Sequence, residues 1–256
     1  MTLGRTLIVK GVIRGGRFVC VWVVVVAALV GGCSPAKVPT GGTAPQTQNP
    51  TQPGTSAPGD AVRYLAMGDS LTQGIGATDL ETGTFPALLA AKWTSDGCQV
   101  ELKNVGISGY TAGQILAEQV PAVAEFQPTL ITFQGGGNDI VNGVTEDEYR
   151  KNVSAVLDAA KNSGARVVVF AQNEWFRSPE GLNYGTEAEL SAKRDALDKI
   201  LIDEAKSHGA QFVDLRPLYK QQADQSLWVE DGIHPTPAAY EAWATEMATA
   251  VPAPCK

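Results

Sequence analysis

Short apolar runs alternate with longer segments of helical spacing along the chain after residue 60. Five of these runs are five or six residues long. Four are rich in apolar side chains, which is typical of buried strands, and the run over 100–105 is mixed but still strand-like. The five runs cover residues 62–67, 100–105, 129–133, 166–170 and 211–215.

The intervals between these runs carry apolar residues at helical spacing. Helices are therefore predicted over 85–93, 111–123, 145–163 and 190–208, with a last one after residue 236. Thr145 and Glu148 match the sequence pattern of a capping box, and Thr236 and Pro237 suit a cap and a first helical residue. Pro121 predicts a kink in the second helix.

This alternation predicts an α/β fold with three layers, α/β/α, around a five-stranded parallel sheet. Right-handed crossovers favour the flavodoxin-like strand order 2-1-3-4-5. Ligands bind such sheets beyond the carboxyl ends of the strands. Candidate chemistry is therefore expected in the turns that directly follow each strand.

The first 60 residues have a different pattern. Residues 1–33 carry four basic residues ahead of an uncharged run, 18–30, that ends in Gly31-Gly32-Cys33. This order is typical of an export signal. The small residues before Cys33 resemble the lipobox of bacterial lipoproteins, which implies lipidation of Cys33 and attachment to the outer side of the cell membrane. The alternative is an uncleaved membrane anchor, and both place the rest of the chain outside the cytoplasm.

Residues 34–60 are rich in Pro, Gly, Thr and Gln and contain no aromatic residue. Such a segment buries too little apolar surface to offset its chain entropy, so we expect a flexible linker. Residues 61–256 then form one folded domain.

Charge narrows the range of partners. The chain has a net charge of −7, and the four basic residues of the export signal leave about −11 on the remainder. A domain this acidic repels phosphate backbones, so we expect no nucleic-acid partner.

Four short blocks rich in Gly, Asp, Asn and Ser lie at expected strand ends or before the last helix. They are Gly68-Asp69-Ser70-Leu71, Asn104-Val105-Gly106, Gly136-Gly137-Asn138-Asp139 and Asp231-Gly232-Ile233-His234-Pro235. Together and in this order they resemble the SGNH hydrolase family, also called GDSL esterases and lipases. The resemblance spans most of residues 61–256 and implies the SGNH hydrolase fold and a serine esterase without a cofactor.

The residues themselves suggest the same chemistry. Ester cleavage needs a nucleophile, a base and an acid that orients the base. Ser70 follows the first strand, where Gly68 permits a sharp turn. His234 is the candidate base, and Asp231 can orient its imidazole. His208, the only other histidine, ends a helix that runs away from the active edge and is expected to contact helix carbonyl groups.

Donors for the developing oxyanion are expected from the Ser70 amide, the Gly106 amide and the Asn138 side chain. The family resemblance implies that Asp69 and Asp139 support these turns without reacting. In the loop from Gln172 to Tyr184, the aromatic residues could bind an acyl chain or a sugar ring at the pocket rim, or simply pack within the loop. These are Trp175, Phe176 and Tyr184, whereas core positions are expected for Trp93, Trp228 and Trp243.

Two of the four cysteines are expected to form a disulfide. Cys20 lies in the export signal and Cys33 would carry lipid, which leaves Cys98 and Cys255 in an oxidising compartment. Both follow helices that end at the edge opposite the active site, on the same face of the sheet.

Other catalytic motifs are missing. Gly106-Ile107-Ser108-Gly109 approaches the nucleophile elbow of α/β hydrolases but has Tyr110 where the second Gly belongs. The sequence contains no P-loop and no metal-binding motif, so no metal or cofactor is expected.

We therefore expect a membrane-attached, monomeric serine esterase that hydrolyses short-chain or acetyl esters of envelope carbohydrates or lipids. The alternatives are an acyltransferase that acts on envelope glycans or lipids, and an envelope-binding protein without catalytic activity.

Overall fold

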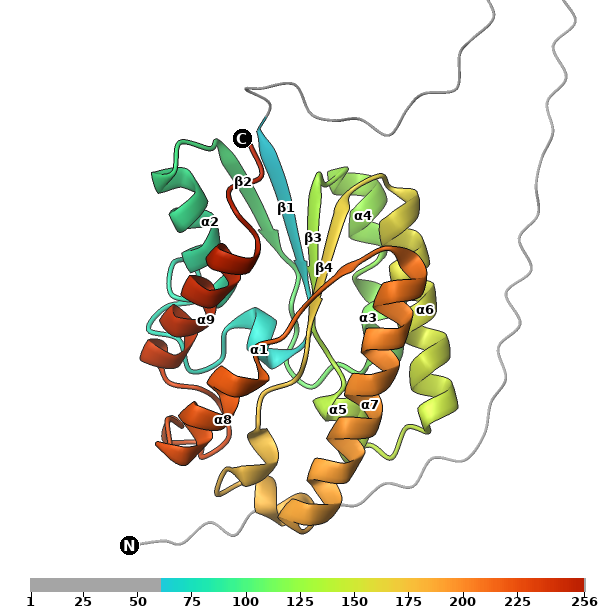
Figure 1. Ribbon diagram of the computed structural model, residues 1–256, viewed down its shortest axis with the longest axis vertical. Coiled ribbons are helices and arrows are strands. Elements are labelled where there is room, and N and C mark those ends of the chain that lie inside the picture. The colour runs from blue at the N-terminus through green and yellow to red at the C-terminus, as the bar shows by residue number, and fades with distance from the viewer. Residues whose placement is uncertain (1–60, 256) are drawn as a thin grey trace, which may run out of the picture. The chain divides into compact units, whose positions relative to one another are not determined.

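The computed structural model describes residues 61–255 (Figure 1). The expected export signal, Cys33 and the linker lie outside these residues. Within 61–255, no helix combines the length and the apolar character needed to cross a membrane.

Five parallel strands form one sheet in the order β2-β1-β3-β4-β5, as predicted. The strands are β1 (Val62–Met67), β2 (Val100–Asn104), β3 (Leu130–Phe133), β4 (Arg166–Phe170) and β5 (Gln211–Val213). All five carboxyl ends therefore lie at the same edge of the sheet.

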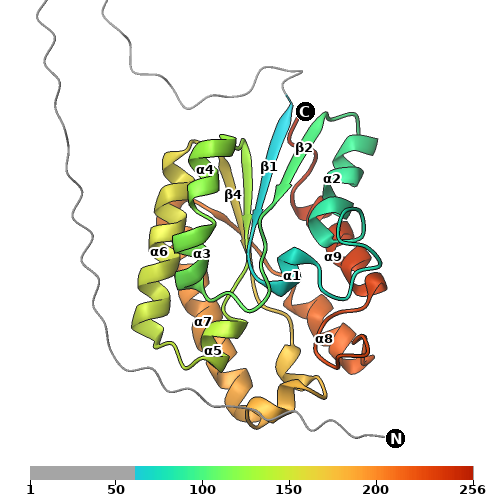
Figure 2. The ribbon, with the colours of Figure 1, turned by 180° about the vertical axis from the view of Figure 1, so that it is seen from behind.

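Helices cover both faces of the sheet, which gives the predicted three layers (Figures 1 and 2). One face carries α2 (Phe85–Ser95), α8 (Arg216–Asp224) and α9 (Pro237–Ala250). The other carries α3 (Ala112–Glu118), α4 (Pro121–Phe126), α6 (Glu146–Asn162) and α7 (Glu187–His208). Short helices lie at the carboxyl edge: α1 (Ser70–Gln73), α5 (Gly137–Val141), and the 3-10 turns η1 (Trp175–Arg177) and η2 (Gly181–Tyr184).

The strands alternate their side chains between two hydrophobic clusters, because successive residues of a strand point to opposite faces. In β1, Leu65 and Met67 join the cluster beneath α3, α6 and α7, whereas Tyr64 and Ala66 join the cluster beneath α2 and α9. Both faces of the central strands are thus apolar, which explains why β1, β3 and β4 appear in the sequence as nearly continuous apolar runs, whereas the edge strand β2 is mixed and only partly buried.

Local structure departs from the predictions at several points. The helix expected over 111–123 is divided into α3 and α4, because Pro121 lacks the N–H that a continuous helix would use. Strand β5 ends at Val213, and the next residue, Asp214, accepts a hydrogen bond from the N–H of Arg216, the first residue of α8. The sequence did not predict α1, α5 or α8.

The core prediction for the tryptophans is correct for two of the three. Trp93 and Trp243 are buried, and their indole N–H groups donate to Val251 O and to Gln222. Trp228 is only half-buried, because it lies in the loop between α8 and α9, where it forms a β-bridge with Pro235.

A disulfide joins Cys98 and Cys255, as predicted. Cys98 precedes β2 and Cys255 follows α9, so the bridge lies at the amino edge of the sheet, near the start of β1 (Figure 1). It ties the C-terminal segment to the edge opposite the strand ends that carry the candidate site.

Candidate active site

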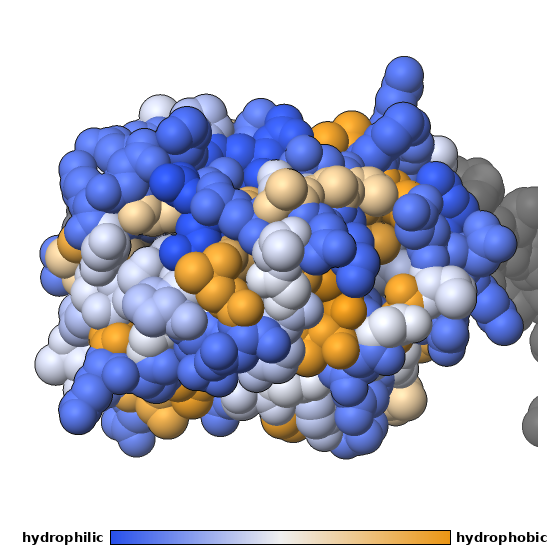
Figure 3. Space-filling view, turned by 90° about the horizontal axis from the view of Figure 1, so that it is seen from below, coloured by the Kyte–Doolittle hydropathy of each residue, from blue (hydrophilic) through white to orange (hydrophobic). Residues whose placement is uncertain are grey.

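A cavity of about 190 Å³ opens at the carboxyl edge of the sheet. Figure 3 views the molecule from the side of this edge, where apolar patches interrupt a hydrophilic surface. The cavity is lined by residues of the turns after β1, β2, β3 and β4 and of the loop before α9. Three of the four sequence blocks thus contribute to one cavity, together with residues that follow the second block.

Ser70 is the first residue of α1 and lines the cavity. Asp69 caps this helix, since its carboxylate accepts a hydrogen bond of 3.0 Å from the Leu71 N–H. The end of β1 is fixed by Gln119, whose side chain bonds both the N–H and the C=O of Gly68, at 2.9 and 2.8 Å. The turn that carries Ser70 is therefore fixed by hydrogen bonds on both sides of the serine.

Asp231 and His234 form a hydrogen-bonded pair in the loop between α8 and α9. The imidazole Nδ1 lies 2.7 Å from Asp231 Oδ2, while Oδ1 accepts the N–H groups of Ile233 and His234, each at 3.0 Å. Partial burial disfavours the Asp231 carboxylate, but these two N–H groups and the imidazole outweigh it and hold the pKa of Asp231 below its ordinary value. The carboxylate is thus ionised at neutral pH and fixes the orientation of the ring.

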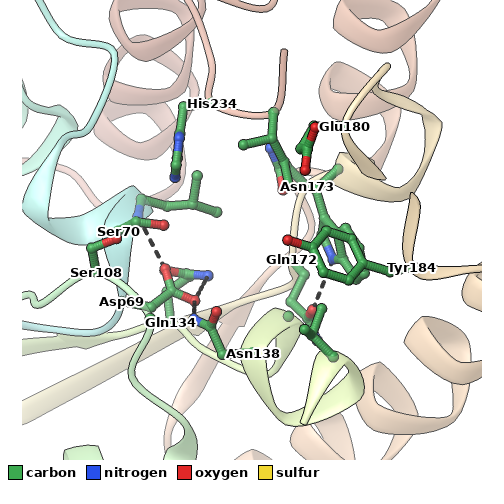
Figure 4. Close-up of a pocket in the computed structure, with 16 residues that line it drawn as sticks. Asp69, Ser70, Ser108, Gln134, Asn138, Gln172, Asn173, Glu180, Tyr184 and His234 are labelled. Carbon is green, nitrogen blue, oxygen red and sulfur yellow. Dashed lines mark hydrogen bonds between the residues drawn. The ribbon is translucent and has the colours of Figure 1, made fainter. Parts of the chain in front are cut away.

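Ser70 and His234 line the same cavity and lie on the same side of it (Figure 4). Because Nδ1 is used by Asp231, Nε2 is the ring nitrogen left for a substrate or a nucleophile. Among the hydrogen bonds of residues 61–255, none joins the Ser70 hydroxyl to this nitrogen. Proton transfer between them requires an approach to roughly 2.6–3.2 Å, which often occurs only when substrate binds.

His208 lies away from this cavity, at the end of α7. Its Nδ1 lies 2.7 Å from the Glu204 carbonyl, and its Nε2 is 3.2 Å from Asp158. It contacts a helix carbonyl group, as expected.

Asn138 lines the cavity from the second position of α5. Its side-chain nitrogen donates to the Tyr110 carbonyl at 3.1 Å and makes a longer contact of 3.5 Å with Asp69 Oδ2. The second contact lies at the limit of a hydrogen bond, so this hydrogen is the one that could serve another acceptor.

Gly106 is not placed as expected. Its N–H donates to the Asn104 side chain at 3.0 Å, and the residue packs against α1, where an added Cβ would come within 2.4 Å of a backbone nitrogen. Gly109, three residues later, lines the cavity instead. In the described part of the chain its N–H donates to no group, and its φ of +84° suits glycine.

The expected aromatic rim is present in part. Trp175 and Tyr184 line the cavity, and their rings meet edge to face with centroids 6.2 Å apart. Phe176 is 2% exposed and belongs to the core beneath α7, so it does not form the rim. The 3-10 turn η1 directs it inwards, where the guanidinium of Arg194 lies over its ring.

Two buried aspartates hold the turns around the site, in the role that the family resemblance implies. Asp139 accepts the Ala112 N–H with both carboxylate oxygens, at 3.2 and 3.0 Å. Asp69 contacts Leu71, Gln134 and Asn138. Burial raises the pKa of Asp69 to about 7 and that of Asp139 to about 6, although their hydrogen bonds oppose the shift.

Several site residues were not indicated by the sequence. Gln119 supports the turn before Ser70, and Gln73 accepts the Ser108 N–H at 2.7 Å. Gln172 and Asn173 line the cavity opposite Ser70. Within residues 61–255 there is no group of three or more His, Cys, Asp or Glu side chains that could hold a metal ion.

Comparison with known proteins matches residues 66–242 to the GDSL-like Lipase/Acylhydrolase family. The chain belongs to this family. The arylesterase of Vibrio mimicus is 30% identical to the chain over 186 residues, which cover 72% of this chain and 84% of the arylesterase. Esterase TesA of Pseudomonas aeruginosa is 30% identical over 109 residues, and that match spans 53% of TesA.

Solved structures agree with the family. A crystal structure of TesA superposes with a TM-score of 0.62 at 26% identity, covering 75% of this chain and 99% of TesA. AlinE4, described as an SGNH-hydrolase family esterase, gives a TM-score of 0.55 at 27% identity, with coverage of 75% and 96%. The chain is thus a carboxylic ester hydrolase with the SGNH hydrolase fold.

Proposed function

We propose that this esterase uses Ser70 as nucleophile, His234 as general base and Asp231 as the acid that orients the base. The observation that carries the proposal is the 2.7 Å hydrogen bond between Asp231 and His234, in a loop that faces the cavity lined by Ser70. It orients the imidazole and leaves Nε2 as the free ring nitrogen in the cavity that Ser70 also lines.

The reaction follows in two steps. The Ser70 oxygen attacks the ester carbonyl carbon while its proton passes to His234 Nε2, and Asp231 stabilises the resulting imidazolium. The tetrahedral intermediate expels the alcohol, which takes the proton from His234. A water molecule, deprotonated by His234, then attacks the acyl-enzyme carbonyl, and the second tetrahedral intermediate releases the acid as the Ser70 oxygen takes the proton back from His234.

The oxyanion of the intermediate needs donors already in place. We assign this role to the N–H groups of Ser70 and Gly109 and to the Asn138 side chain. The Ser70 N–H is free because the first amides of a helix have no partner within it, and the Gly109 N–H is free at the cavity wall. Gly109 thus takes the place that the sequence suggested for Gly106.

The preferred substrates are short-chain or acetyl esters of carbohydrates or lipids. The small volume of the cavity supports this choice, because a cavity of about 190 Å³ holds a short acyl group better than a long one.

Hydrolysis of p-nitrophenyl acetate by the full chain tests the catalytic assignment. Ser70→Ala and His234→Ala should each lower kcat by about 10⁴-fold or more, and Asp231→Asn by about 10²- to 10⁴-fold. His208→Ala is the matched control and should retain the wild-type rate. Equal rates for wild type and Ser70→Ala would remove the assignment, and loss of activity only in His208→Ala would reverse the choice of base.

We also propose that Cys33 carries lipid and holds the enzyme on the outer side of the cell membrane. The basic residues, the uncharged run and Gly31-Gly32-Cys33 support this. Incorporation of labelled palmitate into the wild-type protein but not into Cys33→Ser is the expected result. Equal labelling of both would contradict the proposal.

A further inference from the structure

The cavity wall opposite Ser70 contains buried amide groups without partners. Asn173 is 3% exposed, and neither its side-chain nitrogen nor its oxygen forms a hydrogen bond with any described residue. Gln172 is 1% exposed; its oxygen accepts a bond of 3.4 Å from the Trp175 indole, but its nitrogen is equally unpaired. Both residues line the cavity and face Ser70 and Asn138 across it (Figure 4).

Such groups are unfavourable for the fold alone. A buried donor or acceptor that loses water and gains no partner destabilises the protein, whereas an apolar side chain of the same shape does not. Nearly all buried polar groups in native proteins are paired. Among residues 61–255 the other unpaired buried side-chain atoms belong to Arg194 and Asp198, which do not line the cavity. Those of Gln172 and Asn173 lie in its wall and therefore point to a ligand that supplies the missing partner.

The loop that carries these amides does not need them to stay in place. Glu174 forms ion pairs with Arg177 at 3.0 Å and with Arg194 at 3.4 Å. The Glu180 N–H donates to the Gly232 carbonyl at 3.1 Å, which joins this loop directly to the loop of Asp231 and His234. Other contacts thus hold the wall at a fixed position relative to the catalytic pair.

We propose that Asn173 and Gln172 form a polar subsite that binds a hydroxyl group of an ester of a polyhydroxylated alcohol. An amide offers a donor and an acceptor side by side, and a hydroxyl both accepts and donates. Glu180 and the exposed ring of Tyr184 line the same side of the cavity and suit a ligand that carries several hydroxyls on a small carbon frame. The described lining contains no Lys or Arg, so an anionic substituent finds no counter-charge there.

This assignment rests on the proposed function, since it names the alcohol part of the ester that Ser70 cleaves. Polyhydroxylated alcohols reach such an enzyme from two sources, as sugars or as glycerol. Both offer the same hydroxyl chemistry to the subsite, so the experiment includes one ester of each.

The test compares kcat/KM for three butyrate esters: 6-O-butyryl glucose, glycerol monobutyrate and butyl butyrate, which lacks a free hydroxyl. The wild-type full chain should prefer at least one hydroxylated ester over butyl butyrate by about 10- to 100-fold. Preference for the glucose ester identifies a sugar as the source, and preference for the glycerol ester identifies glycerol.

Asn173→Leu removes both polar atoms at nearly constant shape. For this variant, kcat/KM for the preferred hydroxylated ester should lie within about threefold of kcat/KM for butyl butyrate. Its melting temperature should rise, because a buried unpaired amide has been removed. A purely structural asparagine would give the opposite change in melting temperature and no change in the ratio of the two kcat/KM values. Asn173→Ala provides the same test of the ratio if the leucine variant does not fold.

Asn162→Leu makes the same chemical change at an exposed position at the end of α6, away from the cavity, and should keep the wild-type ratio. The subsite is overturned if the wild type does not distinguish the esters or if Asn173→Leu retains the wild-type ratio. Failure of the catalytic assignment is a separate result, namely equal hydrolysis of p-nitrophenyl acetate by wild type and Ser70→Ala.

Discussion

Removal of the Cys98–Cys255 disulfide should strongly destabilise the fold and leave catalysis unchanged. The bridge joins positions 157 residues apart. For a closed loop of that length, the chain-entropy model gives a loss of about 5 kcal/mol in the free energy of unfolding, and measured losses for native bridges are roughly 2–5 kcal/mol. Cys98 is buried, so the double variant Cys98→Ala/Cys255→Ala avoids placing a hydroxyl in the core.

Urea denaturation of both proteins measures this loss. A decrease of roughly 1–2 M in the midpoint corresponds to the expected free energy for a domain of this size. The slope m should increase, because the unfolded chain without the bridge is more expanded and exposes more surface. The wild type unfolded in reducing agent should behave like the double variant.

The catalytic part of the prediction follows from position. The bridge lies at the amino edge of the sheet and the cavity at the carboxyl edge, and the direction of the strands in Figure 1 shows that these edges are opposite ends of the sheet. Below the unfolding transition, kcat/KM for p-nitrophenyl acetate should equal that of the wild type. A stability loss under about 1 kcal/mol would refute the entropic reasoning, and a fall in kcat/KM of the folded variant would refute the separation of bridge and site.

Three further predictions concern charge, the oxyanion site and the core. Burial raises the pKa of Asp198, which is 1% exposed, to about 7. The folded protein therefore keeps a proton that the unfolded chain loses above about pH 4. The free energy of unfolding should fall as the pH rises from about 4 to about 7. Asp198→Asn should gain stability relative to wild type between pH 4 and pH 8 in urea unfolding, and a constant difference would contradict this. Gly109→Ala should lower kcat by about 10- to 100-fold, because a side chain strains the φ of +84° that holds this N–H at the cavity wall. Gly106→Ala should mainly lower stability, because its Cβ has no room, and the reverse pattern would return the oxyanion role to Gly106. Trp243→Ala should cost about 3–5 kcal/mol of unfolding free energy and half-buried Trp228→Ala about 1 kcal/mol, and equal losses would contradict the burial difference.

The layers and strand order could be predicted because they depend on patterns that the sequence displays directly. A strand buried on both faces is an apolar run, and a covering helix shows apolar residues at a regular spacing. Helices of one turn, such as α1 and α5, show no periodicity. They form because Asp69 caps the first and the glycine turn after β3 leads into the second, and such contacts depend on the tertiary structure.

The candidate site could be predicted where its geometry is local. Asp231 and His234 are three residues apart, and one turn brings them together. Gly106 and Gly109 lie in the same turn and are the same residue type, so composition could not distinguish them. Which glycine can donate to the oxyanion depends only on where its N–H points. The N–H of Gly106 is already bonded to the Asn104 side chain.

The sequence predicts Gln172 and Asn173, the proposed subsite residues, only as the start of a loop. Polar residues after a strand are usually exposed, and nothing in their neighbours indicates burial. The ion pair of Glu174 with Arg194 of α7 holds this loop against a helix that begins more than ten residues further along the chain. Predicting that requires knowledge of which helix packs against the loop.

The domain has two functional poles that result from strands running in one direction. Val62 starts β1 and Cys255 is held at the same edge, so both ends of the domain leave from the pole remote from the cavity. Fusion partners or immobilising tags joined at either end of the domain therefore lie away from the cavity and should leave turnover intact.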